Sequence, residues 1–208
     1  KPDYAVGGFD LSVRGDLTAA VLIFTKKNDP TLYVESMFWM PEEALDAHVR
    51  SDGVPYDVWH KQGFLQICPG NQVDYDMVSD WFEEMRDKHE LIIPWIGYDP
   101  AYASWLVDKM KTTFGEGAMQ VIRQGFMTLG MPFATIEKMI RAHQVNYNEN
   151  PIMRYCLMCL SVEEDRNGNI MPSKRKSNVK RIDGFSAMLN AWAVLSNNRE
   201  QYDRLLDY

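Results

Sequence analysis

The first forty residues alternate between apolar runs and short turn-forming segments. Residues 6–12 and 17–24 are rich in Val, Ile, Leu and Phe, and the intervening "VRGD" has the length and the glycine of a hairpin turn. A third apolar run, "TLYVESMFWM", follows the turn signal "KNDP". Three successive strands with short connections predict an antiparallel meander.

The pattern then changes to helical spacing interrupted by short apolar runs. Helical spacing, N-terminal acids and terminal glycines predict helices over residues 41–52, 54–63, 74–89, 100–115, 132–144, 150–162 and 182–198. Short apolar runs predict further strands over residues 64–70, 91–99 and 118–125. Such alternation implies parallel pairing with helices on the faces of the sheet, so we expect one α/β domain with a mixed sheet.

The composition is that of a folded globular protein. Of the 208 residues, 46% are hydrophobic and 25% are charged. Charges or prolines interrupt every apolar run before it reaches the roughly 18 residues of a membrane helix, and no signal peptide is visible. The three cysteines, Cys68, Cys156 and Cys159, favour a reducing, cytoplasmic setting over a disulfide scaffold. The last two form a CxxC without a second ligand pair, so we expect buried helix residues and not a zinc site.

Three aspartates stand where ligands gather in α/β folds. Asp10 lies near the end of the first predicted strand, Asp99 ends "LIIPWIGYD", and Asp183 begins the last predicted helix. Three such acids could hold two divalent ions about 3.5–4 Å apart, an arrangement that promotes attack of water on a phosphodiester. Oxygen ligands favour Mg²⁺ or Mn²⁺ over zinc. Each acid alone also fits a structural role, as a turn residue or a helix cap, so both interpretations stay open.

Segments in the same order along the chain resemble one known family. They are "GGFDLSVRGDLTA", "VPYDVWHKQGFLQICPGNQVDYDMV", "IGYDPAYA", "VIRQGFMTL" and "NPIMRYCLMCLSVEEDRNGNIMPSKRKSNVKRIDGFSAMLNA". From Gly7 to Trp192 the chain resembles the C-terminal nuclease domain of the large terminase subunit of tailed bacteriophages. The resemblance implies a ribonuclease-H-like fold with a metal-dependent carboxylate cluster, which cuts concatemeric viral DNA during genome packaging.

The resemblance also assigns residues. The family's three acids fall on Asp10, on Asp99 in "YDP" and on Asp183 in "RID". Asp16 matches the family's "DLT" and is expected in a supporting position behind the ligands. A complete large subunit also carries a packaging ATPase with a GxxxxGK[ST] loop, a motif that does not occur in this sequence. We therefore expect residues 1–208 to be the nuclease domain of a larger subunit, without ATP-driven translocation.

A basic run lies directly before Asp183. The segment "SKRKSNVKR" contains no acid and five basic residues, Lys174, Arg175, Lys176, Lys180 and Arg181. The net charge is −7, so the rest of the chain carries about −12 and this run is the expected contact for DNA phosphates. Lys174 is our first choice for orienting the scissile phosphate, and Arg123 in "VIRQG" is the second. A solvated surface loop is the alternative interpretation of the run.

The remaining aromatic and histidine residues favour packing over chemistry. Trp81 and Trp105 occupy positions on the inferred buried faces of helices, which indicates core material and not a base-stacking platform. The four histidines lack metal-ligand spacing. A general-base role for His60 or His143 is a minor alternative.

The sequence thus predicts an endonuclease that cleaves concatemeric double-stranded DNA with two Mg²⁺ or Mn²⁺ ions and little sequence specificity. In the full-length protein the expected partners are the portal, the small terminase subunit and the ATPase domain, in the cytoplasm of the infected bacterial host. No membrane contact and no secretion are expected. Two alternatives stay open: a recombination or Holliday-junction nuclease of the same fold, and a non-catalytic domain that docks on the portal or capsid.

Overall fold

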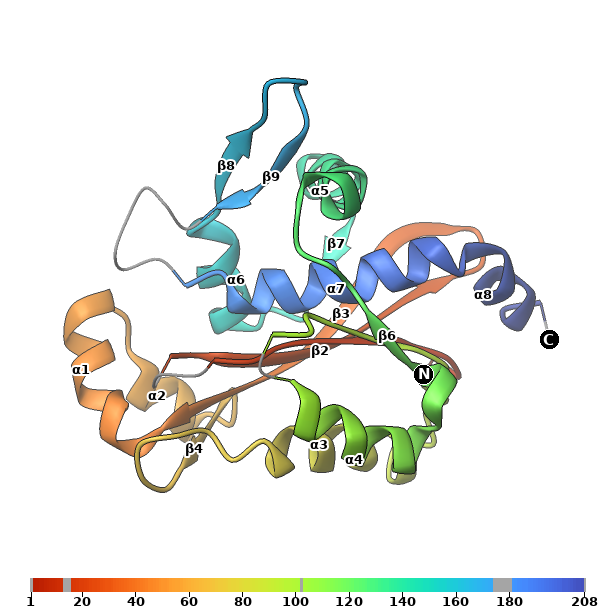
Figure 1. Ribbon diagram of the computed structural model, residues 1–208. Coiled ribbons are helices and arrows are strands. Elements are labelled where there is room, and N and C mark those ends of the chain that lie inside the picture. The colour runs from red at the N-terminus through yellow and green to blue at the C-terminus, as the bar shows by residue number, and fades with distance from the viewer. Residues whose placement is uncertain (1, 13–15, 102, 174–180, 208) are drawn as a thin grey trace.

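Short strands and helices alternate along the whole chain in the computed structural model, which describes residues 2–12, 16–101, 103–173 and 181–207 (Figure 1). The strands are β1 (Val6–Asp10), β2 (Thr18–Lys26), β3 (Asp29–Pro41), β4 (Leu65–Cys68), β5 (Ile96–Tyr98), β6 (Met119–Val121), β7 (Val145–Asn146), β8 (Ser161–Glu164) and β9 (Ile170–Ser173). The helices are α1 (Glu42–Asp52), α2 (Tyr56–Lys61), α3 (Asp76–Asp87), α4 (Ser104–Phe114), the 3₁₀ turn η1 (Glu116–Ala118), α5 (Phe126–Arg141), α6 (Pro151–Met158), α7 (Asp183–Asn197) and α8 (Arg199–Leu205).

A mixed sheet forms the centre of the molecule (Figure 1). Its strand order is β4-β3-β2-β1-β5-β6, and β7 pairs with β3. β1, β2 and β3 are antiparallel neighbours, which confirms the predicted meander. β5 runs parallel to β1, and β6 runs parallel to β5, so these three strands end at the same edge of the sheet. The expected single α/β domain with a mixed sheet is confirmed.

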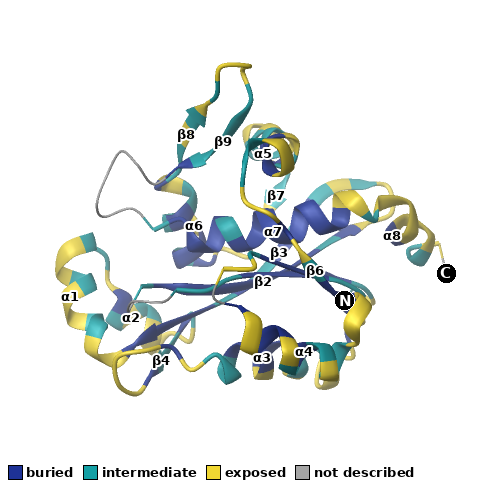
Figure 2. Cartoon of the chain, in the orientation of Figure 1, coloured by how far each residue is buried: buried dark blue, intermediate teal, exposed yellow. Residues whose placement is uncertain are grey.

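Helices cover both faces of this sheet. α7 lies along one face with α5 and α6 beside it, and α3 and α4 lie on the other (Figure 1). The sequence of β2 is continuously apolar because both faces of this strand are buried. Ala19 and Val21 pack in the core on the α7 side, while Ala20 and Leu22 pack in the core on the α3 side. α7 is the most buried helix in Figure 2 and is dark along nearly its whole length.

Two predicted helices have different boundaries in the structure. α5 begins at Phe126 and not at Pro132, because the proline lies inside the helix and does not start it. The helix predicted over 150–162 ends at Met158, after which the chain turns into the hairpin β8–β9. At the tip of this hairpin the Asp165 carboxylate accepts hydrogen bonds from the backbone N–H groups of Asn167 and Asn169. None of the helices in the described ranges combines the length and the apolar character needed to cross a membrane.

Candidate functional site

Asp10 and Asp99 end neighbouring parallel strands. Phe9 of β1 pairs with Tyr98 of β5, so the next residue of each strand, Asp10 and Asp99, leaves the sheet at the same edge. Both residues are half-buried. The Asp99 Oδ1 atom accepts a hydrogen bond from the backbone N–H of Ala101 at 3.0 Å, which fixes the turn after β5. Asp99 does not cap α4, whose N-cap position is Ala103. The two strands therefore place Asp10 and Asp99 at one edge of the sheet, as their positions at strand ends predict.

Two glycines let α7 lie directly on the strands that carry these acids. A Cβ atom at Gly8 of β1 would lie 2.3 Å from the carbonyl oxygen of Ala187. A Cβ atom at Gly97 of β5 would lie 2.5 Å from the carbonyl oxygen of Asn190. No side chain fits in either space, so the helix backbone can approach this closely only because both strand residues are glycines.

Asp183 is the first residue of α7 and is brought to the same region by that close packing. It is 3% exposed and lies one helical turn before Ala187, about 6 Å along the helix axis. The N-cap position belongs to Ile182, so Asp183 lies in the first turn and not at the cap. Farther along α7, the Asn190 Nδ2 group donates a hydrogen bond to the carbonyl oxygen of Phe9 at 3.0 Å. This bond ties the helix to β1 one residue before Asp10.

The described side chains do not form a preassembled metal site. Across the described ranges, no group of three or more His, Cys, Asp or Glu residues is arranged to hold a metal ion. The three predicted ligands thus lie on elements that converge, but their carboxylates are not gathered around one point. Their assignment as metal ligands stays a prediction.

Asp16 and Arg181 form an ion pair across 165 positions of sequence. Arg181 Nη1 donates to Asp16 Oδ1 at 2.5 Å, and Arg181 Nε donates to Asp52 Oδ2 at 2.8 Å. The Nη2 group donates to Asp52 Oδ1 at 3.3 Å and to His48 Nδ1 at 2.7 Å, because a guanidinium can only donate. The side chain of Arg181 is 13% exposed and that of Asp52 is fully buried. The predicted DNA contact of Arg181 is untested, but its guanidinium faces protein groups.

Burial and pairing act in opposite directions on the charges around Arg181. Burial alone would lower the pKa of Arg181 and raise the pKa of Asp52. Their mutual hydrogen bonds and charges outweigh burial, so the pKa of Arg181 is raised and the pKa of Asp52 is lowered. The Tyr56 hydroxyl donates a hydrogen bond to Asp52 at 2.9 Å. Burial, and to a lesser extent the negative charge of Asp52, raises the pKa of Tyr56. Near neutral pH the arginine and the carboxylate are therefore both charged.

Arg123 lies at the same edge of the sheet as Asp99. Tyr98 of β5 pairs with Val121 of β6, and the Ile122 N–H donates to the carbonyl oxygen of Tyr98 at 2.8 Å. Arg123 follows directly, is exposed, and has no hydrogen-bond or ion-pair partner among the described residues. The other four basic residues predicted to contact DNA lie outside the described residues: Lys174, Arg175, Lys176 and Lys180.

The aromatic and cysteine predictions have mixed outcomes. Trp81 is buried in the core as predicted, at 6% exposure. The prediction for Trp105 was wrong: it is 60% exposed, because the buried face of α4 is formed by Leu106, Val107 and Met110. Cys156 and Cys159 are buried as expected, Cys156 inside α6 and Cys159 directly after its last residue, and Cys68 is buried as well.

The two histidines considered as general bases are exposed and do not lie at the sheet edge that carries Asp10 and Asp99. His60 is on α2, where its Nδ1 atom lies 2.9 Å from the carbonyl oxygen of Leu65. His143 follows α5 in a left-handed backbone conformation with φ of 56°. Neither residue is on an element that carries one of the three acids, and a general-base role for either stays untested.

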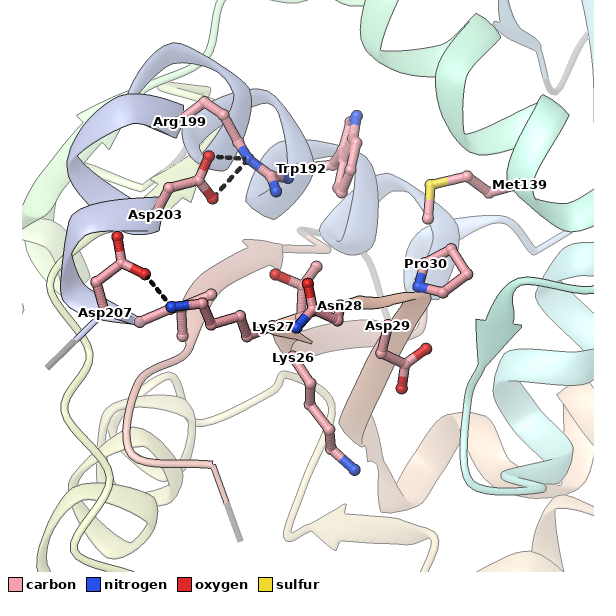
Figure 3. Close-up of a pocket in the computed structure, with 12 residues that line it drawn as sticks. Lys26, Lys27, Asn28, Asp29, Pro30, Met139, Trp192, Arg199, Asp203 and Asp207 are labelled. Atoms are coloured by element: carbon pink, nitrogen blue, oxygen red, sulfur yellow. Dashed lines mark hydrogen bonds and ion pairs between the residues drawn. The ribbon is translucent and has the colours of Figure 1, made fainter.

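A cavity of about 590 Å³ lies at the far end of β2 from Asp10 (Figure 3). It is formed by the β2–β3 turn, the end of α7, α8 and Met139 of α5. Two ion pairs lie in its lining: Arg199 is 2.9 Å from Asp203, and Lys27 is 2.7 Å from Asp207. None of the predicted site residues that the structure describes lines this cavity, which lies away from the sheet edge that carries Asp10 and Asp99.

Sequence reasoning missed Asp52, His48 and Asn190. Asn190 had a signal, because it is a polar residue within the otherwise apolar run "AMLNAWAVL" and a buried amide needs hydrogen-bond partners. Gln124 donates to its Oδ1 atom at 3.2 Å. Asp52 had no signal, since an acid at the end of an amphipathic helix ordinarily faces solvent.

Residues 3–198 match the family model for the terminase large subunit, endonuclease domain. The large terminase subunit of Enterobacteria phage HK97 is 31% identical over 185 residues, which cover 87% of this chain and 35% of that protein. Protein YmfN of Escherichia coli strain K12 is 21% identical over 193 residues, which cover 88% of this chain and 41% of that protein. The chain thus spans well under half the length of these curated relatives.

Solved structures of the same kind share the fold. The crystal structure of the HK97 bacteriophage large terminase matches with a TM-score of 0.80 and 28% identity, over 93% of this chain and 40% of that one. The g2p large terminase nuclease domain of bacteriophage SPP1 with bound Mn matches with a TM-score of 0.56 and 11% identity, over 94% of this chain and 87% of that one. The large terminase nuclease of thermophilic phage G20c with bound magnesium matches with a TM-score of 0.56 and 10% identity, over 93% of this chain and 82% of that one. The last two likenesses concern the fold alone, and they confirm the ribonuclease-H-like sheet.

Proposed function

The chain belongs to the endonuclease-domain family of terminase large subunits, and from that membership we propose that it is a Mg²⁺- or Mn²⁺-dependent nuclease that cleaves double-stranded DNA. The observation that carries the proposal is the parallel pairing of β1 and β5 beneath α7. It ends both strands at one edge, so that Asp10, Asp99 and Asp183 come from elements that converge there.

The donor chemistry at this edge fits hard divalent cations. Asp10, Asp99 and Asp183 offer only carboxylate oxygens, which are the ligands that Mg²⁺ and Mn²⁺ prefer. Two relatives of the same fold carry bound Mn and magnesium, which supports the proposal. The two ions, when bound, supply Lewis-acid stabilisation of charge at the phosphate and at the departing oxygen. Because the described carboxylates are not preassembled, binding requires them to move closer together.

Other residues of the chain act on DNA in this proposal. Arg123 is an exposed cation beside Asp99 and binds a backbone phosphate. Lys174, which the sequence places nine positions before Asp183, orients the scissile phosphate. These contacts reach phosphates and not base edges, so cleavage has little sequence specificity.

We also propose that the domain works within a larger packaging protein. The curated relatives are much longer than this chain, which covers 35% and 41% of their lengths. In that setting residues 1–208 form the nuclease domain, and the packaging ATPase, the portal and the small subunit are its partners. The substrate is then concatemeric viral DNA in the cytoplasm of the infected host.

Plasmid cleavage tests the role of the acids. We expect Asp10→Asn, Asp99→Asn and Asp183→Asn each to reduce the Mn²⁺-dependent cleavage rate at least about 100-fold, because even outer partners of metal ligands are worth about 10–100-fold. Cleavage is measured by gel assay at several Mn²⁺ and Mg²⁺ concentrations. Asp46→Asn is the matched control, since Asp46 is an exposed acid on α1, and it should cleave like the wild type.

Three outcomes contradict the proposal. Equal cleavage by the wild type and Asp10→Asn removes the metal-site assignment. Absence of cleavage by the wild type under all metal and salt conditions indicates a docking domain. A strong preference for four-way junctions over linear duplex indicates a junction nuclease.

A further inference from the structure

Arg181 joins three segments that border the proposed metal ligands. It lies two residues before Asp183, and it pairs with Asp16 in the β1–β2 connection and with Asp52 at the end of α1. We propose that Arg181 is a positioning residue, which with Asp16 and Asp52 forms a clamp that holds the start of α7 against the β1–β2 connection. This inference rests on the proposed function, because the clamp acts through the acids of that site. We call these three residues the Arg181 clamp.

One side of the clamp is anchored in a rigid cluster. The Asp52 carboxylate accepts hydrogen bonds from the Ser51 hydroxyl at 2.7 Å and from the Tyr56 hydroxyl at 2.9 Å. The Tyr56 ring is fully buried and makes edge contacts with the rings of Trp59 on α2 and Tyr155 on α6. Asp52 therefore has a fixed position from which it can hold the guanidinium.

The other side of the clamp reaches the segment that carries Asp10. Asp16 Oδ1 accepts from the Leu17 N–H at 2.8 Å as well as from Arg181. The backbone oxygen of Asp16 accepts from the Ser12 hydroxyl at 2.7 Å, and Ser12 is two residues after Asp10. Fixing Asp16 therefore fixes the chain where it leaves β1. This contact favours the supporting position predicted for Asp16, which stays a prediction.

Charge and geometry distinguish a positioning role from simple stabilisation. Buried ion pairs add little net stability compared with well-packed apolar residues, because removing both charges from water is costly. What a guanidinium supplies is direction, since its planar fork holds Asp52 with two donors and Asp16 with a third. Four hydrogen bonds at 13% exposure also leave this group poorly available to a DNA phosphate.

The test compares Mn²⁺ affinity and DNA affinity in variants of the full chain. We expect Arg181→Met to weaken Mn²⁺ binding, measured by isothermal titration calorimetry, by about 10–100-fold. Its affinity for duplex DNA without divalent metal should stay within about twofold of the wild type. Arg181→Lys, which keeps the charge but loses the fork, should show most of the same loss of Mn²⁺ affinity.

Two further variants separate positioning from stability. Ile23→Ala removes a buried side chain at the far end of β2 and should lower the melting temperature while leaving Mn²⁺ affinity unchanged. In Arg181→Met the buried Asp52 carboxylate loses its partner, and this can prevent folding. The double variant Arg181→Met, Asp52→Leu removes that charge as well, so it should fold even where Arg181→Met does not. It should still bind Mn²⁺ weakly.

Each outcome has a defined meaning. Wild-type Mn²⁺ affinity in the folded Arg181 variants contradicts the clamp and leaves the proposed function intact. Loss of DNA affinity with unchanged Mn²⁺ affinity also contradicts it, and supports Arg181 as a DNA contact. Absence of Mn²⁺ binding by the wild type contradicts the proposed function and the clamp together.

Discussion

Arg123 and Arg181 carry the same charge in opposite environments, and their roles differ accordingly. Arg123 is exposed at the edge that holds Asp99, without a partner among the described residues. Arg181 is nearly buried and paired with two carboxylates. A cation that is free to exchange its counterions contributes to DNA affinity, whereas a cation already neutralised by protein groups contributes to geometry.

Replacing Arg123 should weaken DNA binding without changing the metal site. We expect Arg123→Gln to lower duplex affinity equally for unrelated sequences, and to reduce the slope of log affinity against log salt by about one. Fluorescence anisotropy over a salt series measures both quantities. Lys138→Gln is the control, because Lys138 is an exposed cation on α5, toward the end of that helix that borders the distant cavity. An unchanged salt slope in Arg123→Gln would exclude a phosphate contact.

The residues differ in how far the sequence could predict them. The shared edge of Asp10 and Asp99 could be inferred because each residue ends an apolar run, and strand ends define the edge where ligands gather. The pairing of Arg181 with Asp52 could not be predicted, because the two residues are 129 positions apart and nothing in the sequence around Asp52 marks its side chain as buried. Trp105 was assigned to the wrong face because the helix was read without its neighbours, and a shift of one residue turns a side chain outward.

At the scale of elements, the site depends on how closely α7 approaches the sheet. Gly8 and Gly97 provide that approach from two adjacent strands, and Asn190 fixes the register between α7 and β1. A helix held farther away would carry Asp183 away from Asp10 and Asp99. The proposed site therefore requires Gly8 and Gly97 as well as its three acids.

A methyl group at Gly8 should destabilise the protein by displacing α7. We expect Gly8→Ala to cost about 1–3 kcal/mol or more in the free energy of unfolding, because the new Cβ atom would meet backbone atoms that cannot rotate away. Urea denaturation measures the change. Gly117→Ala is the matched control, since no atom lies within 4 Å of a Cβ atom there, and it should stay within about 0.5 kcal/mol of the wild type. Equal stabilities would contradict the close packing of α7.

The elements themselves were largely predictable, and their boundaries less so. The meander and the alternation of strands and helices follow from apolar periodicity, which is why the mixed sheet could be inferred. The strands of the hairpin β8–β9 were not predicted, because they are short and half-exposed and lack an apolar alternation. The pairing of β1 with β5 joins segments about ninety residues apart, and only the tertiary structure sets its register.

At the scale of the whole molecule, the proposed site residues gather at one edge of the sheet. Asp10, Asp99, the start of α7, Arg123 and the Arg181 clamp lie at or beside the ends of β1, β5 and β6. The cavity of Figure 3 lies at the opposite end of β2 and has two ion pairs in its lining. The length of β2 separates these two places, so substitutions around the cavity should leave metal binding unchanged.

A crystal structure of this chain soaked in Mn²⁺ tests the central claim most directly. The proposed function predicts anomalous difference peaks between Asp10, Asp99 and Asp183, with the three carboxylates closer together than in the metal-free state and with carboxylate oxygens as ligands. Peaks elsewhere, with these three aspartates unmoved and unbound at saturating Mn²⁺, would contradict it.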